Sequence, residues 1–162
     1  MRLRDGTEAA IRPIRPDDKD RLRAAFRGLE PASVYTRVFH AKKDLSDEEL
    51  RRLTEFDPAK QAALVVTVGS GKDERIIAVG RYIASGDAAE VAFTVEEDYQ
   101  RNGLAGRLLR ELAEIARARG LARFEAFVLP ENHAMLAVFE RSGLDVKRRY
   151  EDGALRLTLE LR

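Results

Sequence analysis

A short turn between Gln100 and Gly106 holds the residues with the clearest chemical potential in this sequence. It follows an apolar run and leads into an amphipathic segment, so it is predicted to connect a strand to a helix. The first amides of such a helix have no intrahelical partner, and the helix dipole adds partial positive charge there. Because Gly103, Ala105 and Gly106 are small, an anion can approach the bare backbone, and the turn suits a pyrophosphate.

The spacing of the small residues separates this turn from two common phosphate-binding motifs. It lacks the G-x-G-x-x-G spacing of the dinucleotide fingerprint, and no Lys-Ser or Lys-Thr follows as in a P-loop. What it contains is Q-x-x-G-x-A, formed by Gln100, Gly103 and Ala105. On the turn alone, a plain structural connection between strand and helix stays open as an alternative.

Few other residues offer reactive groups. Glu90 opens the apolar run Glu90–Val95, where it is either a general base or a strand-end carboxylate that faces solvent. Asn132 precedes a predicted helix and is suited to cap it. The absence of Cys removes thiolate nucleophiles, disulfides and most zinc sites. The two histidines, His40 and His133, lack metal-ligand spacing, so no metal is expected.

Length and composition bound the class of protein. We expect a single domain over residues 1–162, long enough to bury a core. The 29 basic and 28 acidic residues are interleaved and give a net charge of +1. No basic stripe favours nucleic acid, no apolar run approaches membrane-spanning length, and the first residues resemble no signal peptide. We therefore expect a cytoplasmic protein that binds neither nucleic acid nor membrane.

The elements that must position these residues can be traced along the chain. Asp5-Gly6 predicts a hairpin turn ahead of the first strand. In the first half we predict a strand at Glu8–Ile14, a helix from Asp17 or Asp18 to about Arg27, a helical stretch at Pro31–Phe39 and a helix opened by the capping box Ser46–Glu49. Because the turn at Gln100–Gly106 is expected to bind an anion, we expect the acceptor substrate to contact residues 31–61.

The second half predicts a sheet with one crossover. The expected elements are strands at 62–68, 75–83 and 90–95, a helix from Gly103 to Gly120, a strand at Arg123–Leu129, a helix at Asn132–Arg141 and strands at 146–150 and 155–161. A strand–helix–strand crossover makes the strand at 123–129 parallel to the one at 90–95. The pattern predicts an α+β (mixed α/β) domain with helices on both faces of a mixed sheet.

This order of elements, with Q-x-x-G-x-A after the central strand and Asn132 after the next, resembles the GNAT superfamily of N-acetyltransferases over nearly the whole chain. A narrower likeness is to the catalytic domain of bacterial protein lysine acetyltransferases. It is carried by Leu3-Arg-Asp-Gly6, Ile11-Arg-Pro-Ile-Arg15, Gly80-Arg-Tyr82, Ala89-Glu-Val-Ala-Phe93 and Leu129-x-x-Asn132-x-x-Met135. The resemblance implies a twisted mixed sheet of about six or seven strands, mostly antiparallel with one parallel central pair.

The resemblance also implies a reaction, the direct transfer of acetyl from acetyl-CoA to an amine in a ternary complex. A free lysine has a pKa of ~10.4 and is less than about 1% neutral at pH 7. Glu90, in the A-E-x-A-F context, corresponds to the general base, and burial would raise its pKa toward neutrality. The residues implied to contact acetyl-CoA are Phe93, Thr94, Val95, Gln100, Arg101, Asn102, Gly103, Leu104, Ala105, Gly106, Asn132 and Phe139.

One position departs from the family pattern. Many GNAT enzymes carry there a tyrosine that protonates the leaving thiolate, but Phe139 cannot donate a proton, so the acid is absent or elsewhere. The residues expected to face the acceptor are Tyr35, Arg37 and Arg81. The narrower likeness indicates a protein lysine as acceptor. Two alternatives stay open: acetylation of a small-molecule amine, and a non-catalytic sensor domain that binds acyl-CoA.

Overall fold

A computed structural model describes residues 1–27 and 45–161. Its first half contains β1 (Ala9–Pro13), α1 (Lys19–Arg27), α2 (Asp47–Thr54), β2 (Gln61–Val68), β3 (Arg75–Ser85) and β4 (Ala88–Val95). The second contains α3 (Leu104–Ala118), β5 (Arg123–Val128), α4 (His133–Glu140), β6 (Asp145–Glu151) and β7 (Ala154–Glu160). Three 3-10 turns are η1 (Pro16–Asp18), η3 (Gly71–Asp73) and η4 (Glu97–Tyr99). The predicted helical stretch Pro31–Phe39 lies outside the described residues.

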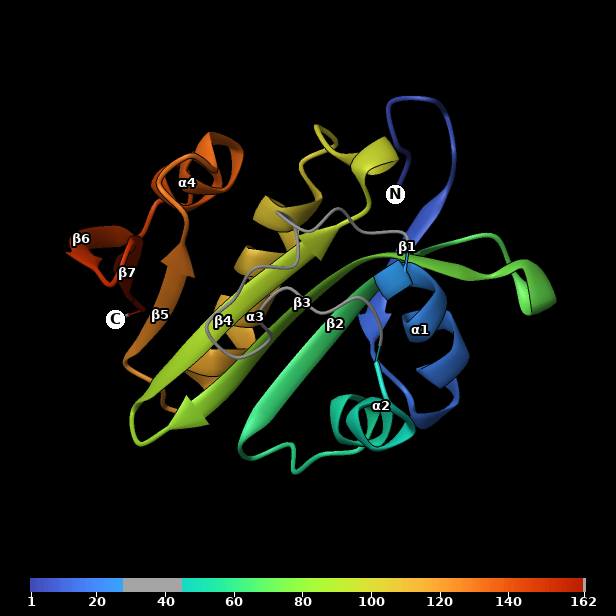
Figure 1. The fold of residues 1–162 in the computed structure, drawn as a ribbon, viewed down its shortest axis with the longest axis horizontal. Helices are drawn as coiled ribbons and strands as arrows, with labels where there is room; N and C mark the ends of the chain where they lie inside the picture. The colour runs from blue at the N-terminus through green and yellow to red at the C-terminus, as the bar shows by residue number, and fades with distance from the viewer. Residues whose placement is uncertain (28–44, 162) are drawn as a thin grey trace.

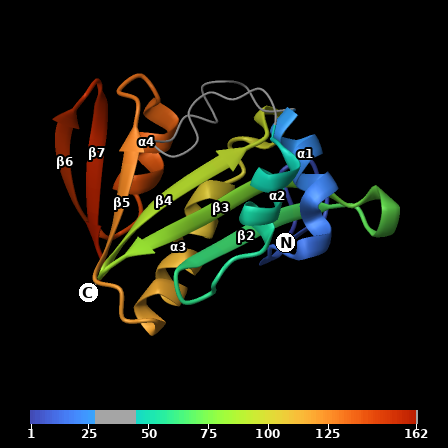
Figure 2. The same ribbon diagram turned by 60° about the horizontal axis from the view of Figure 1, so that its bottom comes forward.

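The seven strands form one twisted sheet in the order β1-β2-β3-β4-β5-β7-β6 (Figure 1). Every neighbouring pair is antiparallel except β4 and β5, which run parallel across the α3 crossover. The mixed sheet and its single parallel pair are therefore confirmed. The last hairpin folds back so that β7, rather than β6, lies beside β5, and β6 becomes an edge strand (Figure 2).

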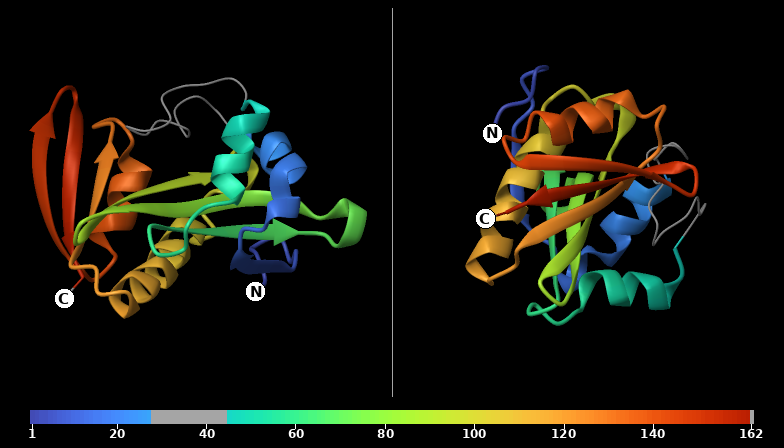
Figure 3. Two further views of the ribbon diagram at one scale, coloured as in Figure 1. Left: turned by 90° about the horizontal axis from the view of Figure 1, so that it is seen from below. Right: turned by 90° about the vertical axis from the view of Figure 1, so that its left-hand side faces the viewer.

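Helices cover both faces of the sheet, as predicted (Figure 3). The larger apolar core lies under α3 and α4 and includes the fully buried Leu108 and Phe124. A smaller core lies under α1 and α2, where Leu22 and Leu50 are buried in one cluster with residues of β2 and β3. In the described part of the chain, no helix is long and apolar enough to cross a membrane.

Local sequence signals set several helix ends. The predicted capping box is present: Ser46 Oγ accepts from the Glu49 amide at 3.1 Å, and Glu49 Oε1 accepts from the Ser46 amide at 3.1 Å. Helix α2 ends at Thr54, with Glu55 as its C-cap. Helix α3 stops at Gly120, whose φ of +81° favours glycine.

Asp18 is not the N-cap that the sequence suggested, because Arg15 takes that position and Asp18 lies three residues inside the helical run. It lies in η1 with no exposed surface and accepts two hydrogen bonds from Arg12 of β1, at 2.7 and 2.8 Å. Arg21 of α1 donates to it at 2.9 Å, and the Arg15 amide donates at 2.7 Å. Glu74 joins through Arg12 at 3.3 Å. This cluster, which the sequence patterns did not predict, fastens α1 to the sheet.

Asp18→Asn should destabilise the protein by about 2–4 kcal/mol, because it leaves the guanidinium groups around a buried site without their countercharge. Burial alone would raise the pKa of Asp18, but the hydrogen bonds from Arg12, the Arg15 amide and Arg21 lower it to about 2. The ionised form therefore stabilises the native state above pH ~4, and this contribution is lost as pH falls toward 2. Urea unfolding between pH 2 and 7 measures both effects.

Asp17→Asn is the matched control, because Asp17 neighbours Asp18 but its side chain is 68% exposed. Its stability should change by less than about 0.5 kcal/mol at any pH in this range. Equal losses in the two variants would show that burial of the Asp18 carboxylate is not what matters.

Candidate active site

The parallel ladder between β4 and β5 is short. It joins only Ala88–Glu90 to Arg123–Glu125, although β4 continues to Val95 and β5 to Val128. Beyond these rows β4 stays paired with β3, β5 stays paired with β7, and the two strands diverge (Figure 1). Within the described residues, one edge of β4 at Phe93–Val95 therefore has no strand beside it.

The turn with the Q-x-x-G-x-A spacing lies at the carboxyl end of β4 and opens α3. Gly103 is the N-cap with φ +72°, a value that favours glycine, and it offers no side-chain cap. The first turn of α3 contains no acidic residue. A Cβ at Gly103 or Gly106 would meet no heavy atom within 4 Å, so the backbone is open to a ligand on this side.

Three other residues of the turn hold its shape. Asn102 Oδ1 accepts from the Arg4 amide at 2.9 Å, and its Nδ2 donates to the Tyr99 carbonyl at 2.9 Å. Gln100 Nε2 donates to the Val95 carbonyl at 3.4 Å. Arg101 is exposed and has φ +69°. The side chain of Asn102 thus supports the loop and ties it to the N-terminal hairpin.

Glu90 lies in the last row of the parallel ladder, where the split begins. It is half-buried and lies opposite Ile83 of β3 and Glu125 of β5. Opposite residues in a ladder point to the same face, and residues two apart in a strand share a face. Glu90 therefore shares a face with Arg81, which packs against α2. Of the predicted site residues, Glu90 and Phe93–Val95 lie on β4, and residues 100–106 form the turn that follows it.

Phe93 and Phe139 meet on the other face. Their ring centroids are 6.0 Å apart, and both side chains are buried. Phe93 also lies over Gly80, whose missing side chain makes room for the ring. Phe139 is accordingly a core residue that joins α4 to β4.

Arg81 is almost fully buried, with 5% of its surface exposed. Its Nη2 donates to the Leu53 carbonyl at 2.9 Å, and its guanidinium lies 5.8 Å from the centre of the Phe56 ring. Burial lowers the pKa of Arg81 to about 10. Its Nη1 is buried and has no hydrogen-bond partner. Arg81 anchors α2 to the face that carries Glu90.

Of the remaining predicted residues, the structure places one and does not describe the others. Asn132 caps α4, because its Oδ1 accepts from the Met135 amide at 3.2 Å, and it follows the carboxyl end of β5. Tyr35 and Arg37 lie outside the described residues, as does His40. The expectation of a metal-free site stays a prediction.

Glu125 is the neighbour that the sequence reasoning missed. It directly faces Glu90 across the parallel ladder, is 26% exposed, and accepts from Arg156 at 2.9 Å. The alternation in Arg123–Val128 places Glu125 on the polar face of its strand. The polar position of Glu125 becomes informative only when the register of the sheet is known, because the register places it opposite Glu90.

Comparison with known proteins identifies the family to which this chain belongs. The chain matches the acetyltransferase (GNAT) family over residues 27–144. An acetyltransferase from Pseudomonas aeruginosa is 32% identical over 135 residues, covering 82% of this chain and 73% of that protein. The acetyltransferase Pat from Mycolicibacterium smegmatis is 32% identical over 146 residues, or 88% of this chain. The chain spans 43% of the length of that second relative. The protein belongs to the GNAT family of acetyltransferases.

Solved structures agree with this assignment. The GNAT domain of S. lividans PAT is similar with a TM-score of 0.85 and 38% identity, covering 99% of this chain and 94% of that one. A Thermoplasma acidophilum N-acetyltransferase, solved in complex with coenzyme A, shares the fold with a TM-score of 0.69 at 16% identity. The resemblance stated from the sequence, and the class of enzyme it implies, are confirmed.

Gly80→Val should destabilise the protein, because a Cβ at this position comes within 3.0 Å of the Phe93 ring and 3.1 Å of Leu108 Cβ. Overpacking of this kind costs about 1–3 kcal/mol and should lower the melting temperature by about 5 °C. Ile83→Val, on the same strand and the opposite face, is the control and should change it by less than about half as much. An unchanged melting temperature for Gly80→Val would contradict the close approach of Phe93.

Proposed function

We propose that this protein transfers acetyl from acetyl-CoA directly to a lysine side chain of an acceptor protein, with Glu90 as general base. The observation that carries the proposal is the split between β4 and β5. It has the glycine turn of α3 at its open end and Glu90 at its closed end. Glu90 belongs to β4, and the glycine turn follows the end of that strand, so both features come from one continuous stretch of chain.

The glycine turn suits the pyrophosphate of acetyl-CoA. An anion there would accept hydrogen bonds from the first amides of α3 and benefit from the helix dipole. The absence of acidic residues in the first turn, and the open space beside Gly103 and Gly106, fit an anionic group of this size. Arg101 is exposed beside the turn and would add positive charge.

The free edge of β4 suits the arm that connects the pyrophosphate to the thioester. Backbone groups at Phe93–Val95 that point into the split have no strand to pair with, so they are available to hydrogen-bond the arm. From Val95 back to Glu90 the strand is about 17 Å long. Asn132, at the end of β5, would contact the arm from the opposite side.

Bound acetyl-CoA would supply the activated acetyl group and, when the C–S bond breaks, the departing thiolate. Glu90 would remove the proton from the incoming ammonium, directly or through one water, so that the neutral amine attacks the thioester carbonyl carbon. Phe139 is buried and has no proton to give, so we assign protonation of the thiolate to solvent. The chain has no cysteine that could carry the acetyl group, which supports direct transfer.

The acceptor assignment depends on the narrower family likeness. The likeness to the GNAT domain of S. lividans PAT covers 99% of this chain, and the chain itself carries the A-E-x-A-F and Leu129-x-x-Asn132 segments. We therefore assign a protein lysine rather than a small amine, and a cytoplasmic site of action.

Gly106→Glu should weaken coenzyme A binding without lowering the stability of the protein. Glutamate at the third helical position favours the helix by about 0.5–1 kcal/mol over glycine. The same side chain places bulk and negative charge where the pyrophosphate would lie. We expect coenzyme A affinity to fall by at least about tenfold while the melting temperature stays equal or rises. Isothermal titration and thermal melts measure both quantities.

Gly106→Ala is the control for that substitution, because it stabilises the helix but adds neither charge nor much bulk. It should retain most of the affinity for coenzyme A. Full affinity in Gly106→Glu would place the pyrophosphate elsewhere.

Glu90→Gln should lower the turnover number by about 10²–10⁴-fold, because the amide cannot accept the ammonium proton. Affinity for acetyl-CoA should not change, since Glu90 lies at the far end of the split from the turn. Glu114→Gln, on the exposed face of α3, is the matched control and should retain full turnover. Full turnover in Glu90→Gln would remove it as the base. Activity on small amines but on no protein or peptide would refute the acceptor assignment alone.

A further inference from the structure

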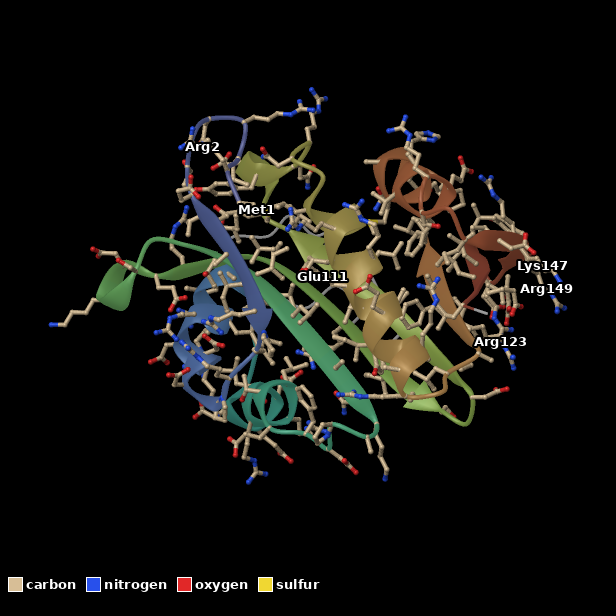
Figure 4. All side chains as sticks on the ribbon, turned by 180° about the vertical axis from the view of Figure 1, so that it is seen from behind. Met1, Arg2, Glu111, Arg123, Lys147 and Arg149 are labelled. Atoms are coloured by element: carbon tan, nitrogen blue, oxygen red, sulfur yellow. The ribbon has the colours of Figure 1, made fainter. Side chains whose placement is uncertain are left out.

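A hollow with a basic lining lies on the outer strands β5, β7 and β6. Its volume is about 410 Å³, and five of its lining side chains are basic against one carboxylate. The lining consists of Arg123, Glu125, Lys147, Arg148, Arg149, Arg156 and Thr158. We call it the basic hollow. Figure 4 shows Arg123, Lys147 and Arg149 gathered at this end of the molecule.

Three of the basic residues already have acidic partners. Arg156 pairs with Glu125 at 2.9 Å, Arg123 pairs with Asp87 at 3.2 Å, and Arg148 pairs with Glu140 of α4.

Lys147 and Arg149 are different. Both are exposed, and neither has an ion pair or hydrogen bond to another side chain in residues 1–27 and 45–161. The acidic residues Asp145 and Glu160 lie opposite each other two rows further along the sheet and do not line the hollow. The hollow therefore presents two positive charges that the described part of the chain does not neutralise.

The register of the sheet connects these charges to the candidate base. Glu90 faces Glu125, Glu125 faces Thr158, and Thr158 faces Lys147, so one row crosses from β4 to β6. Members of a row point to the same face of a sheet. Three strand spacings of about 4.8 Å separate β4 from β6, which is about 14 Å. An extended polypeptide covers that distance in about four or five residues.

We propose that the basic hollow binds an acidic segment of the acceptor protein, about four or five residues from the lysine that receives the acetyl group. This inference depends on the proposed protein acceptor and names the sequence chemistry that it would carry. A chain whose lysine reaches Glu90 and which continues over β5 and β7 arrives at Lys147 and Arg149. Carboxylates there would supply the missing countercharge and favour such acceptors over neutral ones.

Peptide acetylation by the full chain tests this. Each peptide contains one internal lysine. The first carries a Glu-Glu pair four and five residues from that lysine, placed before it in one version and after it in another. The second carries Ala-Ala at the same positions. A third peptide carries the pair ten residues away. With the pair at four and five residues, kcat/KM should rise about 3- to 10-fold over the alanine peptide, mostly through KM. The advantage should shrink as salt is raised from about 50 to 500 mM.

Lys147→Glu/Arg149→Glu should abolish this advantage or reverse it in favour of a Lys-Lys pair at the same positions. Lys147→Gln/Arg149→Gln, a milder change on the same edge strand, should abolish it without reversal. Lys72→Glu/Arg110→Glu makes the same change in net charge at exposed positions away from the hollow and should keep the advantage.

The outcomes separate this inference from the proposed function. If all peptides are acetylated equally, or the distant pair works as well as the near one, the basic hollow does not select acidic acceptors and the lysine acetyltransferase proposal stands. If no peptide is acetylated while small amines are, the protein acceptor is wrong and this inference fails with it. Binding of a single-stranded oligonucleotide that is lost in Lys147→Glu/Arg149→Glu, with no preference among peptides, would identify nucleic acid as the occupant instead.

Discussion

The site depends on the early end of one β-ladder. After three rows of parallel pairing, β4 stays with β3 and β5 stays with β7, so the inner edges of the parallel pair separate. Phe93 and Phe139 then pack together on the α3 face. Backbone groups left without a ladder partner in a protein interior are costly unless something else hydrogen-bonds them. The split is therefore suited to a ligand rich in amide groups, and the candidate base lies where the ladder stops.

The opposite face is held by buried charge as well as by apolar packing. Asp18 fastens α1 to β1 through Arg12, and Arg81 fastens α2 to β3 through the Leu53 carbonyl. Each charge is taken out of water, which is expensive unless the geometry is good. Together they position the helices that border the face on which Glu90 lies.

The net charge of the chain is close to zero, but its charges are distributed unevenly between two regions of the sheet. The first turn of α3 is free of acidic residues and suits an anionic cofactor. Far along the same sheet, Lys147 and Arg149 present positive charge on the face that carries Glu90. In the proposed function and the inference drawn from it, the two regions would contact different reaction partners.

The sequence by itself determined the order of elements, the capped start of α2, the glycine turn before α3 and the parallel crossover, because these depend on residues near one another in the chain. It also marked Glu90 and Phe139, through local motifs. Only the tertiary structure placed Glu125 opposite Glu90, buried Arg81 under α2, gathered the Asp18 cluster and aligned Lys147 with Glu90. Most of those relations depend on strand order and register, which bring together residues far apart in the chain and leave no periodic trace in the sequence.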